Sequence, residues 1–451
     1  MRPLLLAALL LPSVATAQAV SVSVPAETYR LPNGLTVVVH EDHSNPLVAV
    51  NVWYHVGSGR EVAGRRGFAH LFEHMMFQGS KHVADDQHFA IVQDAGGTLN
   101  GSTNTDRTNY FETVPANYLE QMLWLEADRM GWLLDALTPQ TLANQISVVQ
   151  NERRQNYENR PYGLASIRVS ELLYPDTHPY HWPTIGYQPD LQAASLADVQ
   201  QFFRTWYGPN NAVLVVVGDV KAGDVRLLAE KYFGPIPAGP AVAKPVPRPA
   251  VLPADRRETM EDRVTLARLT LAWPGVELWN RDQAPLAVLA QILGAGKTGR
   301  LYERLVYTEQ AAQSVSAFNG SAEIAGSFTI QLTAPAGEAL TRLEREALEE
   351  IHRLATEGPT AAEVQQAITR TEAASVFALA SAAGVADRLN GYQTFRGTAN
   401  LFDQDLARYR AVTPDDVRRV AAAYLDGRPR VALSVVPLGK PELAAQPEAT
   451  P

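Results

Sequence analysis

Hydrophobic and polar positions follow two different periods along the chain. A period of two, or a short apolar run between turn residues, predicts a β-strand, whereas apolar positions three and four apart predict an amphipathic helix. The predicted strands are residues 28–40 with a Pro-Asn-Gly turn inside, 47–56, 98–104, 110–114, 212–217, 264–273, 326–333 and 431–436. The predicted helices are residues 66–79, 89–94, 117–134, 139–159, 191–206, 282–293, 300–307, 337–356, 360–379 and 413–424.

The second half of the chain repeats the order of elements found in the first. Its last helix and strand, 413–424 and 431–436, mirror residues 197–207 and 213–217 at an offset of about 218 positions. This internal similarity indicates a duplicated domain.

A change of composition separates the two copies. Residues 235–254 are rich in Pro, Ala and Gly, which predicts a semi-rigid linker on the surface. The predicted domains on either side are residues 27–234 and residues 255–437. The Pro/Ala/Glu-rich residues 438–451 are predicted to form a disordered tail.

The N-terminus has the pattern of an export signal. A basic start precedes an apolar run from Leu4 to Leu11, and the small-x-small site Ala15-Thr-Ala17 follows. This pattern predicts a cleaved secretory signal peptide at residues 1–17. The expected location is therefore outside the cytoplasm, and periplasmic if the source is a Gram-negative bacterium.

Composition narrows the classes of function. The 451 residues are 46% hydrophobic and 19% charged, with a formal net charge of −9. A negative net charge is not typical of nucleic-acid-binding proteins. The chain contains no Cys, so disulfides and thiolate metal ligands are excluded.

His70, Glu73 and His74 lie together in the predicted helix 66–79. Positions i, i+3 and i+4 share one face of a helix, so the two imidazoles can bind one metal ion with the carboxylate beside them. Imidazoles at this spacing suit zinc, and a neighbouring carboxylate can take a proton from water. The order His-x-x-Glu-His is the inverted form of the zinc-protease helix signature. On these five residues alone, structural histidines in a buried helix stay an equal alternative.

A catalytic zinc site needs a third protein ligand as well as an open position for water. Residues 147–157 contain one acidic candidate, Glu152, which follows an apolar helical stripe. Without the upstream motif, a solvated glutamate paired with Arg153 or Arg154 would be the better interpretation.

The two stretches taken together resemble the insulinase/pitrilysin family of zinc peptidases, in particular its bacterial members of about this length. The resemblance rests on His70-Leu-Phe-Glu-His74 and on Asn151-Glu-Arg-Arg154, with 78 positions between His74 and Glu152. It extends from about residue 27 to about residue 437 and is more specific in the first half. Further segments that carry it are residues 96–103, 106–110, 126–130, 159–163 and 207–211.

The resemblance implies an α+β fold of two similar domains, each a mostly antiparallel sheet packed with helices. The domains would face each other like a clamshell around an enclosed chamber. It also implies Zn²⁺ on His70, His74 and Glu152, Glu73 as the general base, and peptides as substrates. Asn100, on the candidate edge strand 97–104, would lie near the scissile bond, although a turn residue between two short strands is an equal alternative.

Two departures from the family pattern bear on activity. Gln145 stands where many relatives carry a carboxylate that supports the metal site, which puts the tuning of that site in question. Val306 and Gln313 align with an Arg and a Tyr that hold the substrate over the metal in relatives. Because some members divide these roles between two chains, we predict a heterodimer in which a paralogous subunit supplies the Arg and the Tyr; a homodimer is the other dimeric arrangement.

Other interpretations stay open at this point. A self-sufficient enzyme would use Arg300, Arg304 or Tyr307 in place of the missing pair. A non-catalytic scaffold subunit would share the fold without the chemistry, and a zinc hydrolase of non-peptide substrates would keep the metal centre. His178 and His181 are predicted to lie in a structural loop, because the proline between them interrupts any helical face.

Overall fold

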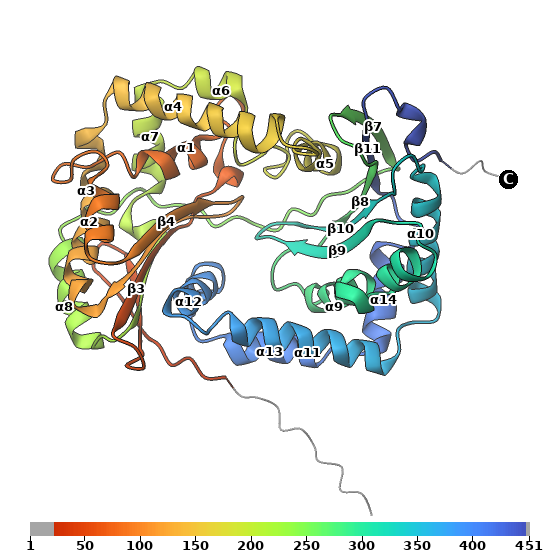
Figure 1. Cartoon of the computed structure of the whole chain (residues 1–451). Helices are drawn as coiled ribbons and strands as arrows, with labels where there is room; N and C mark the ends of the chain where they lie inside the picture. The colour runs from red at the N-terminus through yellow and green to blue at the C-terminus, as the bar shows by residue number, and fades with distance from the viewer. Residues whose placement is uncertain (1–21, 448–451) are drawn as a thin grey trace, which may run out of the picture.

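The computed structural model describes residues 22–447, which form two halves that lie side by side, each built on one β-sheet with helices (Figure 1). This architecture confirms the predicted α+β class with two similar domains. The predicted signal peptide, residues 1–17, lies outside the described residues.

The strands belong to two sheets whose pairing is mostly antiparallel. Within residues 22–447 they are β1 (Glu27–Arg30), β2 (Thr36–Glu41), β3 (Leu47–Tyr54), β4 (Thr98–Thr103), β5 (Thr108–Pro115), β6 (Ala212–Gly218), β7 (Arg256–Asp262), β8 (Arg268–Gly275), β9 (Ser314–Ser321), β10 (Gly326–Thr333) and β11 (Val431–Pro437). The first sheet has the order β1-β2-β6-β3-β5-β4, and the second has the order β7-β11-β8-β10-β9.

The two sheets share one topology. The pairs β2–β6 and β7–β11 are parallel, and every other pair is antiparallel. Strands β2, β6, β3, β5 and β4 of the first sheet therefore correspond in order and direction to β7, β11, β8, β10 and β9 of the second. This correspondence agrees with the duplication that the sequence indicates.

The helices surround these sheets. Among the described residues the α-helices are α1 (Phe68–Met75), α2 (Gln87–Asp94), α3 (Leu119–Ala136), α4 (Pro139–Arg153), α5 (Ala165–Leu173), α6 (Gln188–Gln192), α7 (Leu196–Trp206), α8 (Ala222–Phe233), α9 (Gln283–Gly294), α10 (Thr341–Thr356), α11 (Ala361–Phe377), α12 (Ala382–Arg396), α13 (Phe402–Arg410) and α14 (Pro414–Tyr424). Two segments are π-helical, η3 (Arg154–Glu158) and η6 (Tyr302–Thr308). Short 3-10 turns are η1 (Ser58–Arg60), η2 (Ala116–Tyr118), η4 (Pro209–Asn211), η5 (Gly296–Thr298) and η7 (Pro441–Leu443).

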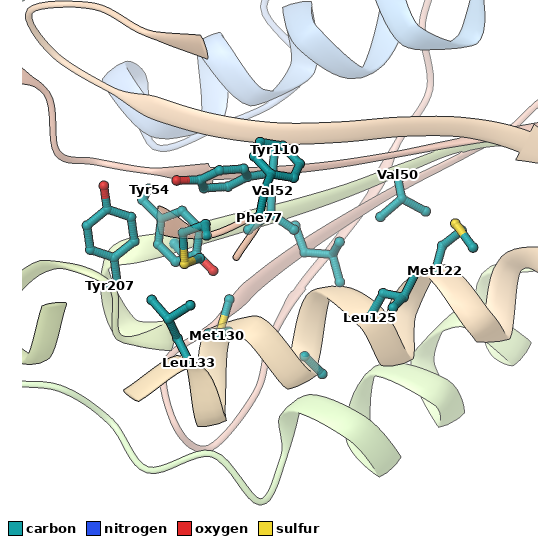
Figure 2. Packing of buried hydrophobic residues seen from close by; sticks show 14 of the residues in the cluster. Val50, Val52, Tyr54, Phe77, Tyr110, Met122, Leu125, Met130, Leu133 and Tyr207 are labelled. Atoms are coloured by element: carbon teal, nitrogen blue, oxygen red, sulfur yellow. The ribbon is translucent and has the colours of Figure 1, made fainter. Parts of the chain in front are cut away.

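Part of the core of the first half lies between one face of its sheet and helix α3, as Figure 2 shows. Side chains of β3 meet side chains from successive turns of α3, because apolar residues recur on one face of the helix and on alternate positions of the strand. The labelled members of this cluster are Val50, Val52, Tyr54, Phe77, Tyr110, Met122, Leu125, Met130, Leu133 and Tyr207.

The opposite face of each sheet is covered by a helix from the other half of the chain. Helix α12 packs against β3 and β6 of the first sheet, where Val385, Ala386 and Leu389 are buried. Asn390 Nδ2 also donates to the carbonyl of Asn51 at 2.9 Å. Helix α5 of the first half packs in return against β8 and β11. The exchange explains why β6 and β11 are buried at every position, since both faces of these strands are covered.

Two predicted boundaries need adjustment. Residues 235–254 form no helix or strand, as a linker should, but Ala250 and Leu252 are buried against the second sheet. The predicted disordered tail is wrong for residues 438–447, because Leu443 and Ala444 are buried in the core of the second half. The N–H of Leu340 also donates to the carbonyl of Leu443 at 2.9 Å, so contacts with the second half hold this segment in place.

No helix in the described part of the chain combines the length and the apolar character that crossing a membrane requires.

Candidate metal centre

Helix α1 carries the two histidines and is fixed at both ends. Its start follows Gly67, which has φ +97°, and the turn after its C-cap residue Met76 contains Gly79, which has φ +91°. These left-handed conformations favour glycine because it has no Cβ. The apolar side of α1 is buried in the first core, so His70, Glu73 and His74 lie on the remaining side.

The third candidate ligand comes from the last turn of α4. Thr138 caps this helix through the N–H of Thr141, and Pro139 occupies its first position, so the start of α4 is well defined. The helix then delivers Glu152 beside α1. Immediately afterwards the backbone changes to the π-helical segment η3, a feature that is frequent at functional sites.

The candidate ligand atoms of His70, His74 and Glu152 lie close together. Glu152 Oε2 lies 3.2 Å from His74 Nε2 and 3.6 Å from His70 Nε2. All three ligand atoms lie within 4.8 Å of one another, and this is the one such group of His, Asp and Glu side chains in residues 22–447. Two atoms bound to a tetrahedral zinc ion at about 2.1 Å lie about 3.4 Å apart. The observed separations therefore fit a zinc ion held by these three residues.

The protonation states also suit a cation. Burial, and then the neighbouring His74, lower the pKa of His70 to about 4, so its imidazole is neutral at pH 7. The contact with His74 lowers the pKa of Glu152, which keeps that carboxylate ionised. Metal binding requires neutral imidazole and ionised carboxylate. His70 Nδ1 is buried without a hydrogen-bond partner among the described residues. Gln145, one of the two departures from the family pattern, is buried in α4.

Glu73 lies between the candidate metal centre and strand β4. Thr103 Oγ1 donates a hydrogen bond of 2.6 Å to Glu73 Oε2. Burial raises the pKa of Glu73, whereas this hydrogen bond acts in the opposite direction. A Cβ on Gly101 would lie 3.1 Å from Glu73 Cγ, so the glycine leaves room for the carboxylate. A carboxylate beside a candidate metal centre is placed to accept a proton from water and to return it.

Strand β4 is an edge of the first sheet, paired on one side with β5. Arg107 Nη1 steadies it with bonds of 2.7 Å to the carbonyl and to the hydroxyl of Ser102. Asn100 is exposed, and its Oδ1 accepts from the N–H of Gly101 at 2.9 Å. An edge strand of this kind can add a peptide as a further strand, and contact between Asn100 and a peptide stays a prediction.

The second half contains no equivalent centre within residues 22–447. Arg300 forms ion pairs with Glu350 and Glu363. Arg304 pairs with Glu309 and Glu349. Both guanidinium groups are thus engaged within their own half. Tyr307, in contrast, is 70% exposed.

The loop with His178 and His181 is structural, as predicted. His178 lies 2.7 Å from the carbonyl of Arg248 through Nε2, and its Nδ1 accepts from the N–H of Tyr180. His181 Nδ1 lies 2.8 Å from the carbonyl of Tyr174. Both rings are therefore held by backbone groups.

Sequence reasoning missed Thr103, whose hydroxyl contacts Glu73, and Glu61, whose carboxylate accepts the N–H groups of Gly67 and Ala69 at 2.8 Å each. Thr103 lies in a correctly predicted strand, but no local pattern indicates which helix faces it. Glu61 precedes α1 by seven positions, too far for a capping signature of the usual spacing.

Comparisons with known proteins agree with this geometry. The family model described as "Insulinase (Peptidase family M16)" matches residues 36–176, and the one described as "Peptidase M16 inactive domain" matches residues 193–371. The chain is 30% identical over 402 residues to zinc protease PqqE of Helicobacter pylori, covering 88% of this chain and 90% of that protein. It is 28% identical over 427 residues to the mitochondrial-processing peptidase subunit beta of Blastocladiella emersonii, covering 91% of this chain and 88% of that protein.

Solved structures show the same similarity. A structure titled as a protease from Helicobacter pylori superimposes with a TM-score of 0.86 at 28% identity, covering 92% of this chain and 100% of that one. A peptidase M16 inactive domain from Pseudomonas fluorescens gives a TM-score of 0.82 at 20% identity, covering 94% and 99% of the two chains, which shows the fold alone. The chain belongs to the insulinase family, peptidase family M16.

Proposed function

We propose that this chain is a zinc-dependent peptidase whose metal ligands are His70, His74 and Glu152. The observation that carries the proposal is the approach of one Glu152 oxygen to both imidazoles, at 3.2 Å and 3.6 Å. Several relatives named as zinc proteases support the choice of metal. Bound zinc would supply Lewis-acid polarisation of the scissile carbonyl.

The residues of the chain perform the remaining tasks. Glu73 accepts a proton from the water that attacks the peptide carbonyl and delivers it to the departing nitrogen. Thr103 holds the carboxylate of Glu73 in place through its hydroxyl. Strand β4 binds the peptide as an additional antiparallel or parallel strand and so presents the scissile bond beside α1.

The proposal includes a second subunit. Val306 and Gln313 stand at the positions where relatives carry the substrate-holding Arg and Tyr. Arg300 and Arg304 are poor substitutes, because releasing either guanidinium would break ion pairs within the second half. The relative named as a subunit beta supports an assembly of two different chains. Export through the predicted signal peptide would place this assembly outside the cytoplasm.

The first experiment measures metal and turnover on the purified chain. We expect about one zinc per chain, little peptide hydrolysis by the chain alone, and full hydrolysis after co-purification with its partner from the native source. Glu73→Gln should retain zinc and abolish hydrolysis, whereas Glu152→Gln should lose zinc. Activity that persists in Glu73→Gln would refute the role of Glu73. Full turnover by the chain alone would refute the heterodimer, and a chain that binds no zinc would favour a non-catalytic scaffold subunit.

A further inference from the structure

A tight turn at residues 183–186 lies against the start of α1. The N–H of Gly186 donates to the carbonyl of Pro183 at 2.9 Å, and Gly186 has φ +74°. A Cβ on Gly186 would lie 2.4 Å from the Cα of Gly67 and 2.5 Å from the carbonyl oxygen of Arg66. A Cβ on Gly67 would likewise lie 2.8 Å from the Cα of Gly186. The two backbones are thus in direct contact, and only glycine permits this approach from either side.

The same turn is bonded to the end of α4. Arg153, the residue after Glu152, donates from Nη1 to the carbonyl of Gly186 at 2.6 Å. Its Nε donates to Glu158 at 3.0 Å, and its side chain is only 11% exposed. One glycine therefore contacts the segment that precedes His70 and also the residue that follows Glu152.

Side-chain carboxylates hold the backbone at the start of α1 through hydrogen bonds. Glu61 accepts from the N–H groups of Gly67 and Ala69 at 2.8 Å each. Asp190 Oδ2 accepts from the N–H of Arg66 at 3.1 Å. Because a helix is stiff over one turn, a shift of Gly67 is transmitted to the imidazole of His70.

We propose that Gly186 and Arg153 are positioning residues that set the distance between α1 and α4, and with it the spacing of the three candidate metal ligands. We call the contact of Gly186 with Gly67 together with its bond to Arg153 the Gly186 clamp. The inference rests on the proposed zinc centre. A metal site tolerates errors of about 0.5 Å in ligand position. Because α4 contributes only one ligand, the position of that ligand depends on how α4 is held against α1.

The experiment compares two glycine substitutions in the full-length chain. Gly186→Ala introduces the clash, whereas Gly397→Ala introduces a side chain at nearly the same angle, φ +76°, with nothing within 4 Å. Both variants place an alanine at nearly the same positive φ, and they differ in the contact with Arg66 and Gly67, which only Gly186→Ala makes. We expect Gly186→Ala to weaken Zn²⁺ binding about 10- to 100-fold, as for other residues that orient metal ligands, and to alter the visible spectrum of the Co²⁺-loaded chain. Gly397→Ala should match the wild type in both measurements.

A second pair of variants covers the case in which Gly186→Ala does not fold. Arg153→Met removes the bond to the carbonyl of Gly186 while keeping an aliphatic stem, and Arg153→Lys keeps one donor for it. We expect Arg153→Met to weaken Zn²⁺ binding and to alter the Co²⁺ spectrum, and Arg153→Lys to restore much of both.

The outcomes separate the two proposals. If the wild type binds Zn²⁺ while Gly186→Ala and Arg153→Met match Gly397→Ala in affinity and spectrum, the clamp is refuted even if those variants are less stable. If Arg153→Met is unchanged and Gly186→Ala does not fold, the clamp is refuted as well. If the wild type binds neither Zn²⁺ nor Co²⁺, the proposed function fails and the clamp fails with it.

Discussion

Replacing Leu389 with Ala should destabilise the first half of the molecule, although Leu389 belongs to the second half of the sequence. Leu389 lies on α12, is 3% exposed, and packs against apolar residues of β2, β3 and β6. If each half folded on its own, this substitution would affect the second half. Because α12 covers the first sheet, we expect the damage to appear there.

The magnitude follows from the burial of this side chain. Removing a fully buried leucine side chain costs roughly 3–5 kcal/mol, from lost transfer free energy and the cavity left behind. A loss of about 3 kcal/mol corresponds to about a 100-fold rise in the equilibrium constant for opening. Native-state hydrogen exchange, read by mass spectrometry of peptides from β3 and β6, measures this constant directly. We expect protection of these strands to fall by about two orders of magnitude.

Leu354→Ala provides the matched control. Leu354 lies on α10, is fully buried, and its apolar cluster contains only residues of the second half. This variant should lower protection in β8 and β10 more than in β3 and β6. The opposite result is that Leu389→Ala gives the same pattern as Leu354→Ala and leaves β3 and β6 protected as in the wild type. In that case the packing of α12 on the first sheet does not couple the stability of the two halves.

Two further predictions concern titrating groups. Thr103→Val removes a hydrogen bond that lowers the pKa of Glu73, so this pKa should rise. The acid limb of the kcat/KM profile, measured on the proposed complex, should then move to higher pH. An acid limb that does not move would contradict the role of Glu73 as the general base. Burial lowers the pKa of His88 to about 3, so below pH 6.5 the unfolded chain binds a proton that the folded chain rejects. The free energy of unfolding should fall as the pH drops from 6.5 toward 3, by about 4 kcal/mol. At pH 4.5 the free energy of unfolding in urea should have fallen less for His88→Phe than for the wild type. Equal falls would refute this prediction.

The sequence predicted best those elements that have a clear local signal, such as a run of apolar residues or a helical period. The strand predicted at residues 47–56 is β3 (Leu47–Tyr54), and the helix predicted at 66–79 contains α1 (Phe68–Met75). Strands β7 and β9 were absent from the prediction, because both are edge strands with mostly polar, partly exposed residues. Such strands lack the apolar run that marks a central strand.

Helix α12 was also absent from the prediction, for a different reason. Its sequence contains Gly384, Gly391 and Asn390, all of which disfavour an isolated helix. A Cβ on Gly391 would lie 3.7 Å from the ring of Trp53, so the helix runs close to the first sheet at this point. Its stability comes from a surface formed by residues more than 150 positions earlier in the chain. No window of neighbouring residues contains that information.

The candidate site divides in the same way. Helical periodicity alone places His70, Glu73 and His74 on one face, because their spacing is local. The approach of Glu152 was expected only through a family resemblance. The contacts of Thr103 with Glu73 and of Gly186 with Gly67 depend on how separate elements pack, and glycine or threonine at these positions carries no distinctive local signal.

The duplicated topology shows why chemistry has to be argued from residues rather than from the fold. Helix α9 follows β8 in the second half as α1 follows β3 in the first, and it contacts α11 as α1 contacts α4. Yet α9 is apolar around most of its circumference, with buried residues that include Leu286, Val288 and Ile292. A helix buried in this way has no side on which imidazoles could meet a cation. The same scaffold therefore carries a candidate metal centre in one half and a packing layer in the other, and the difference lies in the side chains of the helices rather than in their arrangement.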